Sequence, residues 1–587
     1  MTNEQKWQSV LRSVEKPGRY TGGEYGQIVK EDASVRMAFC FPDVYEIGMS
    51  NLGMRILYEA INRTEGVACE RVYAPWTDMA QKMREHGLAL RSHETARPVA
   101  DFDIVAFTLQ YELCYTTVLQ MLDLAGLPIF ARDRSEDMPI IIGGGPCTYN
   151  AEPVADFFDI FSIGEGEEAL PELCLLMKEM KENGTYTKAA FLERAARLEG
   201  FYVPSLYEVT YNENGTISAI TPTKDGVPKQ VRKRIIADLD KAPFPEKFVL
   251  PYIETVHDRT VVEVSRGCIR GCRFCQAGMV YRPIREKLPE TLCRQAKCLY
   301  ENSGYDEVSM ITLSISDYSE LPALTDKLLE WTDDAHVGLS LPSLRIDSFS
   351  EQLMQKVSSV RASGVTFAPE AGTQRLRDVI NKNVTEEDLM RSATIAFRNG
   401  KGSIKLYFMQ GLPTETDEDL AGIADLADKV VGAYYALPKG ERNRSVSVTV
   451  SVSCLVPKPF TAFQWEAQDS LEEMQRKQQF LRSQIKNKHV KYNWHDARVS
   501  RLEAVFAKGD RKLSAAIAEA FRQGMCFDAW DECFDYDKWM AVFESCGIDP
   551  SFYANRKMQD DEVLPWDVID CGISKAFLKR EREKAYS

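Results

Sequence analysis

The sequence has no apolar stretch that approaches the roughly 18 consecutive residues needed for a membrane-spanning helix. Its polar N-terminal segment has no apolar core followed by a small-residue cleavage site, so we expect neither export nor membrane association. The chain also lacks internal repeats and low-complexity tracts. In a chain of 587 residues these absences favour a cytoplasmic protein of several globular units, at the usual size of about 100 to 200 residues each.

Positive charge is scarce overall, because 72 lysines and arginines face 87 aspartates and glutamates, giving a formal net charge of −15. This balance excludes a protein covered in nucleic-acid-binding charge but allows a local basic face. Residues 476–512 contain eleven lysines or arginines against three acidic residues, with Tyr492, Trp494 and His495 among them. Arginine beside aromatic rings suits RNA bases and phosphates, whereas a helical cap with its own salt bridges explains the stretch without a ligand.

Fifteen cysteines in such a chain should be mostly reduced and buried, because the cytoplasm keeps thiols from pairing. Three stand apart, since Cys268, Cys272 and Cys275 form a C-x3-C-x2-C array within SRGCIRGCRFCQAG. Three thiolates on one tight loop can each hold one iron of a [4Fe–4S] cluster and leave the fourth iron open. Structural zinc is the main alternative, but no second ligand pair lies nearby in the sequence.

The N-terminal part alternates short apolar runs with helical patterns, which predicts a parallel, doubly wound sheet. The expected strands are 35–41, 103–109, 139–145 and 159–167. Gly143, Gly144 and Gly145 end the third run, where bare backbone can approach a ligand at the carboxyl edge of the sheet. A tight turn with no ligand is an equally good interpretation of these glycines.

A second α/β region begins at Thr260 and contains six strand-like runs separated by helical segments, which predicts a partial (β/α)6 barrel. The runs are 260–265, 307–314, 336–343, 364–370, 403–409 and 445–454. The predicted fold class is therefore α/β, with a Rossmann-like domain, the barrel and a helix-rich C-terminal region. The expected boundaries are 1–34 for an N-terminal extension, 35–200 for the Rossmann-like domain, 201–254 for a hairpin and linker, 255–470 for the barrel and 471–587 for the helical region.

The cysteine loop resembles the signature of radical S-adenosylmethionine (SAM) enzymes, C-x3-C-x-aromatic-C, with Phe274 as the aromatic residue. In that superfamily the open iron binds SAM, and one-electron reduction yields a 5′-deoxyadenosyl radical that abstracts hydrogen from the substrate. The resemblance implies SAM-binding residues on successive strands and an external electron donor of the flavodoxin or ferredoxin type. The candidate cofactor-binding residues in this region are Phe274, Ser314, Ser316, Asp317, Ser343, Arg345 and Glu370.

Nearly the whole chain resembles an uncharacterised group of radical SAM proteins with a B12-binding domain. The resemblance rests on FPDVYEIGMSNLGMRILYE (41–59), VPKPFTAFQW (456–465) and LPWDVIDCGISKAFLKRE (564–581), while residues 141–170 resemble the B12-binding domain and KLYFMQGLPTETDED (405–419) resembles a methylthiotransferase segment. It implies a cobalamin-binding-type domain, with cobalamin as a further cofactor. One departure is that the D-x-H-x-x-G motif, which supplies a lower cobalt ligand, is missing after the first strand.

These residues lead us to expect an enzyme that adds a methyl or methylthio group to an unactivated carbon of RNA or a ribosome-associated protein, recruited through 476–512. Such carbons have no acidic proton, so the cofactor must supply radical chemistry. A radical rearrangement or ring formation on a small metabolite, without cobalamin, is a second hypothesis. A third is an iron–sulfur factor that binds nucleic acid and no longer turns over SAM.

Overall fold

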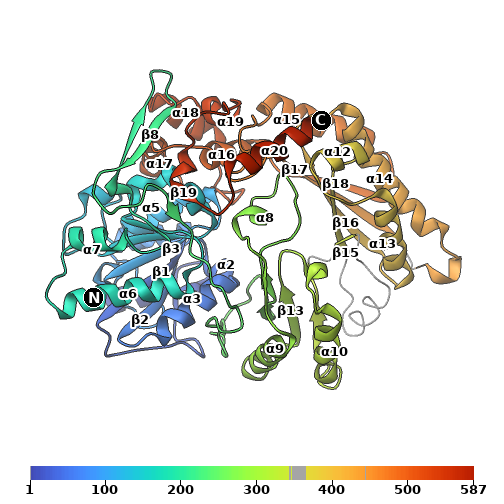
Figure 1. Cartoon of the computed structure of the whole chain (residues 1–587). Helices are drawn as coiled ribbons and strands as arrows, with labels where there is room; N and C mark the ends of the chain where they lie inside the picture. Colours follow the sequence, from blue (N-terminus) through green and yellow to red (C-terminus); the bar gives the residue numbers. More distant parts are fainter. Residues whose placement is uncertain (1, 343–344, 347–364, 443–444) are drawn as a thin grey trace. The chain divides into compact units, whose positions relative to one another are not determined.

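A computed structural model describes residues 2–342, 345–346, 365–442 and 445–587 of the chain. The chain divides into two compact units, each assembled from separate segments (Figure 1). Unit 1 comprises Met1–Asp258, Phe506–Pro550 and Asp561–Gly572, and unit 2 comprises Arg259–Val505, Ser551–Asp560 and Ile573–Ser587. The region 471–587, which we expected to form one helical unit, is therefore shared between the two.

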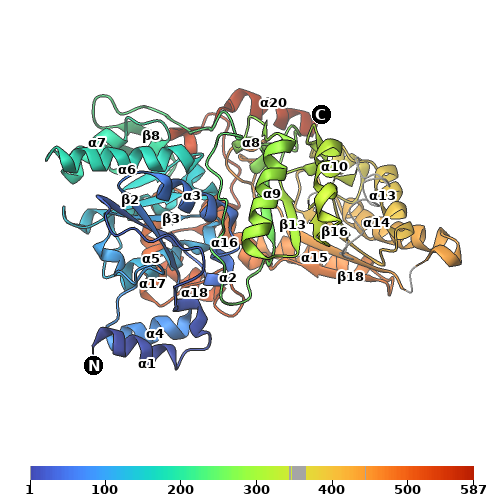
Figure 2. The same cartoon turned by 90° about the horizontal axis from the view of Figure 1, so that it is seen from below.

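Unit 1 is built on a six-stranded sheet with the strand order β2-β1-β3-β4-β5-β6. The strands are β1 (Val35–Phe41), β2 (Val67–Tyr73), β3 (Ile104–Thr108), β4 (Ile140–Gly144), β5 (Ile160–Ser162) and β6 (Phe201–Tyr202). The first five are parallel, and β6 runs antiparallel to β5. Figure 2 shows α3 (Leu52–Arg63) and α6 (Gly166–Glu182) on one face, and α5 (Tyr115–Leu124) and α17 (Leu513–Arg522) on the other. This arrangement confirms the predicted doubly wound, Rossmann-like sheet.

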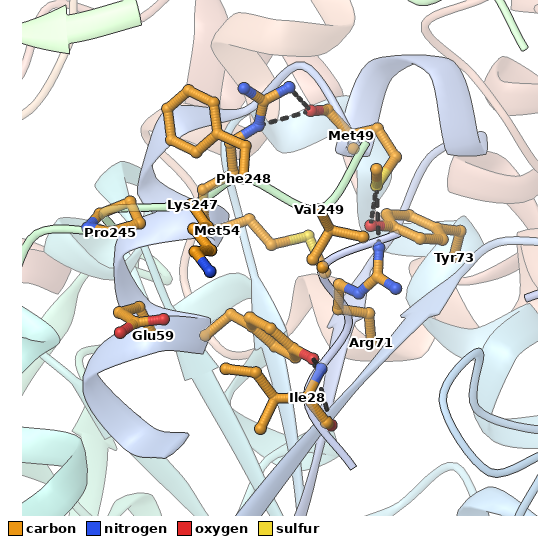
Figure 3. A pocket seen from close by; sticks show the side chains of 14 residues that line it. Ile28, Met49, Met54, Glu59, Arg71, Tyr73, Pro245, Lys247, Phe248 and Val249 are labelled. Atoms are coloured by element: carbon orange, nitrogen blue, oxygen red, sulfur yellow. Dashed lines mark hydrogen bonds between the residues drawn. The ribbon is translucent and has the colours of Figure 1, made fainter. Parts of the chain in front are cut away.

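Strand β2 is absent from the sequence-based prediction because Glu70 and Arg71 interrupt its apolar pattern, VACERVY. Both charged residues are nevertheless buried, being 2% and 3% exposed. Arg71 donates to Glu94 Oε1 at 2.6 Å and to Glu24 Oε2 at 3.0 Å. Its remaining amino group lies 3.1 Å from Met49 Sδ, as Figure 3 shows. The buried guanidinium is thus paired inside the fold, which is the condition for burying such a charge.

The C-terminal segment of unit 1 packs on helix α5 and contributes a buried aspartate. Asp528 is 1% exposed, and its carboxylate accepts hydrogen bonds from Thr116 Oγ1 at 2.6 Å and from Trp539 Nε1 at 2.8 Å. Burial raises the pKa of Asp528 to about 6, because the charged form loses its hydration inside the protein.

We expect Asp528→Asn to reduce the pH dependence of stability. Because the pKa of Asp528 is higher in the folded than in the unfolded chain, the folded state binds this proton more tightly. The free energy of unfolding should therefore fall by up to about 3 kcal/mol as the pH rises from 4 to 6. Urea unfolding followed by tryptophan fluorescence should show this component in the wild type and in the exposed control Asp531→Asn. An unchanged pH dependence in Asp528→Asn would contradict it.

Unit 2 contains two parallel sheets whose strands alternate with helices. The first has β10 (Thr260–Glu263), β13 (Glu307–Ile311) and β14 (Gly338–Ser340), and the second has β15 (Val365–Glu370), β16 (Ser403–Gln410), β17 (Ser447–Cys454) and β18 (Val490–Trp494). The helices are α9 (Pro289–Ser303), α10 (Leu321–Thr332), α12 (Gln374–Val379), α13 (Glu386–Arg398), α14 (Asp417–Ala436) and α15 (Leu471–Gln484). Each predicted strand segment overlaps one of these strands, which confirms the predicted alternation of parallel strands and helices. Strand β18 lies in the region that we expected to be helical.

The sheet β15–β18 has one apolar and one polar face. Ile404, Leu406 and Phe408 of β16 are buried in a core with residues of α13 and α14 and with alternate valines of β17. Lys405 and Tyr407, which lie between them, point to the opposite face because side chains alternate along a strand. The apolar face therefore carries the helices, and the polar face is left for other contacts.

Local sequence signals form as expected at several positions. The predicted hairpin consists of β7 (Tyr207–Tyr211) and β8 (Ile217–Pro222). Helix α14 begins with a capping box in which Thr416 and Asp419 exchange hydrogen bonds. Among the residues with described positions, no helix has both the length and the apolar character to cross a membrane.

Candidate functional site

The three cysteines of the predicted cluster motif lie on the loop that follows β10 and the short strand β11 (Ser265–Arg266). Cys268, Cys272 and Cys275 are half-buried free thiols. The backbone N–H of Arg270 donates to Cys268 Sγ at 3.4 Å, and that of Gly278 donates to Cys275 Sγ at 3.3 Å. Such donors stabilise negative charge on sulfur, as a thiolate that ligates iron requires.

The electrostatic surroundings of the loop are mixed. Burial raises the pKa of the Cys272 thiol, while the positive charges of Lys382 and Arg345 act in the opposite direction. Burial also raises the pKa of Cys275, and each of these two thiols interacts electrostatically with the other cysteines of the loop. Within the described ranges, no three His, Cys, Asp or Glu side chains converge on the space of one metal ion. A cubane requires a different arrangement, because each thiolate holds a separate iron.

Gly267 gives the loop its tight start. Its φ of +88° lies in the region that favours glycine, and a Cβ there would stand 2.8 Å from the carbonyl oxygens of Tyr281 and Pro283. A side chain at this position would therefore displace the loop immediately before Cys268.

Hydrogen bonds join the cysteine loop to the end of α12 and to the residues that follow it. The backbone N–H of Arg273 donates to Ile380 O at 3.0 Å, and its guanidinium donates to Val379 O at 2.7 Å. Asn381 Nδ2 in turn donates to Gly271 O at 2.8 Å. Phe274 packs in the same apolar cluster as Ile380, so the structure places this ring against the α12 segment. The loop is thus held on a second strand–helix unit of the barrel.

Predicted residues after β13 form a hydrogen-bonded group with the cysteine loop. Asp317 accepts hydrogen bonds from Arg270 Nε at 2.9 Å and from Ser314 Oγ at 2.8 Å. Burial would raise the pKa of Asp317, but these hydrogen bonds outweigh it and the pKa is lowered. Ser316 Oγ accepts from the backbone N–H of Arg345 at 2.9 Å. The predicted Ser343 lies outside the described residues.

Glu370 ends β15 in a strained conformation beside a lysine. Its φ is +69°, which is uncommon for a residue with a side chain, and strand pairing is irregular just before it. Lys382 Nζ lies 3.1 Å from Glu370 Oε1, and Lys382 O accepts from Arg345 Nη2 at 3.3 Å. Burial raises the pKa of Glu370 despite the nearby lysine. The structure therefore brings Arg345 and Glu370 together, and it adds Lys382.

Lys382 was not among the residues that we selected from the sequence. It ends the segment FAPEAGTQRLRDVINK, in which Glu370 alone carries an obvious polar strand-end position. The signal that could have found it is its place in the connection between β15 and α13, because such connections lie at the carboxyl edge of a barrel. Its charge reaches Cys272, so it belongs to the same site.

Packing against neighbouring residues requires glycine at two of the three positions in the glycine-rich turn of unit 1. A Cβ on Gly143 would lie 2.7 Å from the Phe161 ring, and one on Gly145, whose φ is +99°, would lie 2.8 Å from Leu109 O. On Gly144 a Cβ would meet only Phe107 O, at 3.9 Å. The first and third glycines are thus required by packing, and Gly144 leaves space.

The strand order of unit 1 reverses between β1 and β3, and open parallel sheets generally bind ligands outside the carboxyl ends of the strands at such a point. Asp43 follows β1 there and accepts hydrogen bonds from Tyr111 Oη and from Trp530 Nε1, the latter at 3.0 Å. Burial raises the pKa of Asp43. The donor set at this point is a carboxyl group, a phenol and an indole, so it supplies no imidazole for cobalt, in line with the missing histidine motif. A corrinoid held without a protein ligand to cobalt is compatible with it.

The basic stretch 476–512 is largely neutralised. Arg476 pairs with Asp417 and Glu473, Lys477 with Glu415 and Asp469, Arg498 with Asp496, and Arg511 with Glu152. The exposed cations that remain in its central part are Arg482, Lys486, Lys488 and Lys491. The three lysines lie on or just before strand β18, whereas Arg482 lies on α15 with its guanidinium 5.7 Å from the ring centroid of the exposed Trp494.

A three-cysteine loop and polar side chains that meet at the carboxyl ends of parallel barrel strands are typical of enzymes that bind an iron–sulfur cluster and an adenosyl cofactor. Comparison with known families agrees. Residues 262–427 match the radical SAM superfamily, and residues 53–204 match the N-terminal region of radical SAM proteins. The chain belongs to the radical SAM superfamily.

Individual proteins resemble the chain more distantly. An uncharacterised protein of Methanocaldococcus jannaschii is 26% identical over 486 residues, covering 82% of this chain and 95% of that protein. An uncharacterised methyltransferase of Pyrococcus horikoshii is 22% identical over 337 residues, covering 56% of this chain and 65% of that protein. Among solved structures, the cobalamin-dependent SAM radical enzyme OxsB with aqua-cobalamin and SAM bound matches with a TM-score of 0.49 and 10% identity, covering 94% of this chain and 79% of that one.

Proposed function

We propose that this enzyme methylates or methylthiolates an unactivated carbon in RNA or a ribosome-associated protein, using a [4Fe–4S] cluster on Cys268, Cys272 and Cys275. The observation that carries the proposal is the meeting of this loop with Arg345, Glu370 and Lys382. When bound, the cluster supplies the electron that breaks a carbon–sulfur bond of SAM. The chain itself has to hold SAM, orient it and keep the loop in place.

The polar side chains around the loop are complementary to an α-carboxylate and an α-ammonium group, which SAM carries on its methionine part. Lys382 and Arg345 carry the positive charge that a carboxylate requires, and Glu370 is an acceptor for an ammonium group. Asp317 is already held by Arg270, so its part is to fix the cysteine loop. Each of these roles is a matter of binding and positioning.

Transfer of a methyl or methylthio group is supported by one relative and by one sequence segment. The matching Pyrococcus horikoshii protein is described as a methyltransferase, and residues 405–419 resemble a methylthiotransferase segment. RNA is favoured as target because exposed cations lie on and before β18 and the Arg482 guanidinium lies 5.7 Å from the ring centroid of the exposed Trp494. A ribosome-associated protein is the other macromolecule that the proposal includes.

The proposal extends to cofactors, partners and location. Cobalamin would lie outside the carboxyl ends of β1 and β3, beside Gly144 and Tyr111, with no histidine on cobalt. A flavodoxin- or ferredoxin-type donor would reach the cluster loop, where Ile269 is 58% exposed. All fifteen cysteines are free thiols, which supports the reducing cytoplasm as the compartment.

Mass spectrometry of a deletion strain tests the function. We expect digests of total RNA or of ribosomal proteins to lack one modified species. In its place they should contain the unmodified species, which is lighter by the mass of a methyl or methylthio group. A plasmid copy of the wild-type gene should restore it, and a copy with Cys272→Ala should not. If both digests are unchanged while the purified enzyme forms 5′-deoxyadenosine only with a small metabolite, the rearrangement hypothesis replaces this proposal.

A further inference from the structure

The polar face of the β15–β18 sheet lies opposite the core that the sheet forms with α13 and α14, and at its carboxyl end Met409 packs against the apolar cluster that contains Leu376 and Ile380. Residues with side chains on this face alternate with the buried residues of the helix-bearing face. They include hydroxyl residues of β17 at every second position, namely Ser447, Thr449, Ser451 and Ser453. Tyr407 of β16 is 40% exposed. This face therefore presents hydroxyl groups, an aromatic ring and, as shown below, two lysines to a bound ligand.

Strand register places these side chains in rows across the sheet. Lys405 pairs with Thr449, which pairs with Lys491, so two lysines flank a threonine in one row. In the next row on this face, Tyr407 pairs with Ser451, which pairs with Asn493. Because neighbouring strands are about 4.8 Å apart, the Cα atoms of the two lysines are about 10 Å from each other. Their long side chains can close on one ligand between them.

The charge on this face is positive and is not neutralised. Lys405 and Lys491 have no carboxylate partner among the described residues, and Lys405 Nζ lies 4.5 Å from the centroid of the Tyr407 ring. The only carboxylate in the four strands is Glu370, which pairs with Lys382. This contrasts with the net charge of −15 of the whole chain. Such a face is complementary to an anion.

The face also leads to the site of the chemistry. Thr366 of β15 pairs with Lys405, which extends this row to the strand that ends at Glu370. At the other side, β18 is the last strand of this sheet in the described part of the chain, so the row ends at Lys491 on an edge. A long substrate can therefore enter from the edge and reach the cluster side along the sheet.

We propose that this face is the substrate-binding surface and that it takes a nucleotide of an RNA strand. Lys405 and Lys491 hold its phosphate, and the base stacks on Tyr407. The hydroxyl and amide side chains of Thr449, Ser451 and Asn493 then meet the sugar and the edge of the base. The inference rests on the proposed function and narrows its substrate from two macromolecules to RNA.

Binding of a defined probe to the reconstituted full-length enzyme tests the inference. The probe is a fluorescein-labelled, mixed-sequence, single-stranded 12-nucleotide RNA, followed by anisotropy at several salt concentrations. The double variant Lys405→Met/Lys491→Met should weaken binding at least about tenfold and flatten the slope of log affinity against log salt by about 1.4, or 0.7 for each lost phosphate contact. Tyr407→Ala should weaken binding roughly tenfold at every salt concentration and leave the slope unchanged.

Matched variants separate charge and stacking from a general disturbance of the fold. Lys405→Arg should retain the salt slope of the wild type, because it keeps the charge, and Tyr407→Phe should retain the affinity, because it keeps the ring. Lys297→Met removes an exposed lysine from α9, outside this sheet, and should bind like wild type. Equal binding of wild type and the double lysine variant would overturn the inference, as would tighter binding of a labelled poly-glutamate 12-mer with the same dependence on both lysines.

The test also distinguishes failure of the inference from failure of the proposed function. If the wild-type enzyme forms 5′-deoxyadenosine but does not bind the RNA probe, the inference is wrong and the protein target of the proposed function stands. If it forms none with any candidate macromolecule, the proposed function fails, while lysine-dependent RNA binding would still support this surface as a nucleic acid site.

Discussion

Replacing any one of Cys268, Cys272 and Cys275 with alanine is expected to abolish both the iron–sulfur absorption and the cleavage of SAM. Each thiolate holds a different iron, and the remaining two cannot retain a cubane with an open iron. Iron and sulfide analysis after anaerobic reconstitution should show loss of the cluster. Formation of 5′-deoxyadenosine should fall below detection in all three variants.

The matched control for this prediction is Cys293→Ala. Cys293 is also a half-buried free thiol of unit 2, but it lies on α9 outside the loop. Its substitution should leave iron content and SAM cleavage unchanged, so a loss in the loop variants could not be ascribed to removal of a thiol as such. Full cluster occupancy in the three loop variants would contradict the assignment of the site.

The cluster loop could be predicted because its signal is local. Three cysteines within eight residues, after a strand and between glycines, determine a loop geometry without reference to the rest of the chain. The strand-end residues Ser314, Asp317 and Glu370 could also be placed, because parallel strands end at one edge of a barrel. What the sequence could not give is their partners, since Arg270 and Lys382 come from other parts of the barrel.

The missed strands have a different cause. In β2 the pattern is broken by Glu70 and Arg71, which the fold buries by pairing them with residues distant in the sequence. Strand β18, VKYNW, does alternate apolar and polar residues, but it is only five residues long and follows a helical segment, and it forms as the parallel partner of β17. Strand β2 thus depends on tertiary contacts that outweigh local preference, whereas the signal of β18 is too short to stand out.

The charge of the basic stretch 476–512 also could not be judged from the sequence alone. Counting its residues gives a strong local excess, but Lys477 and Arg511 are committed to Glu415 and Glu152 inside the fold. The cations that remain for a ligand lie near β18, and Lys491 alone among them joins the polar face of the sheet. Counting charges in the sequence therefore overstates the basic surface and does not show which cations are available to a ligand.

Arg71→Met is expected to cause the largest loss of stability, about 3–5 kcal/mol, because it leaves buried carboxylates without their cation. The guanidinium contacts Glu94 at 2.6 Å and Glu24 at 3.0 Å, and all three side chains are at most 3% exposed. The cavity beside Arg71 (Figure 3) has a volume of about 20 Å³, room for about one water molecule. Arg84→Met, which removes an exposed pair with Asp123, should cost less than about 1 kcal/mol.

The acid response of the same variant gives a second readout. Burial would raise the pKa of Glu24, but contacts with His93 and Arg71 outweigh it and lower the pKa to about 2. In wild type this group therefore stabilises the fold fully above its unfolded pKa of about 4.3, and the contribution is lost as the pH falls towards 2. Without Arg71 the pKa should rise and the loss should begin at higher pH. Urea midpoints between pH 3 and 7 should show this shift in Arg71→Met and not in Arg84→Met, and an unchanged midpoint at pH 7 would show that the buried pairing is not what stabilises β2.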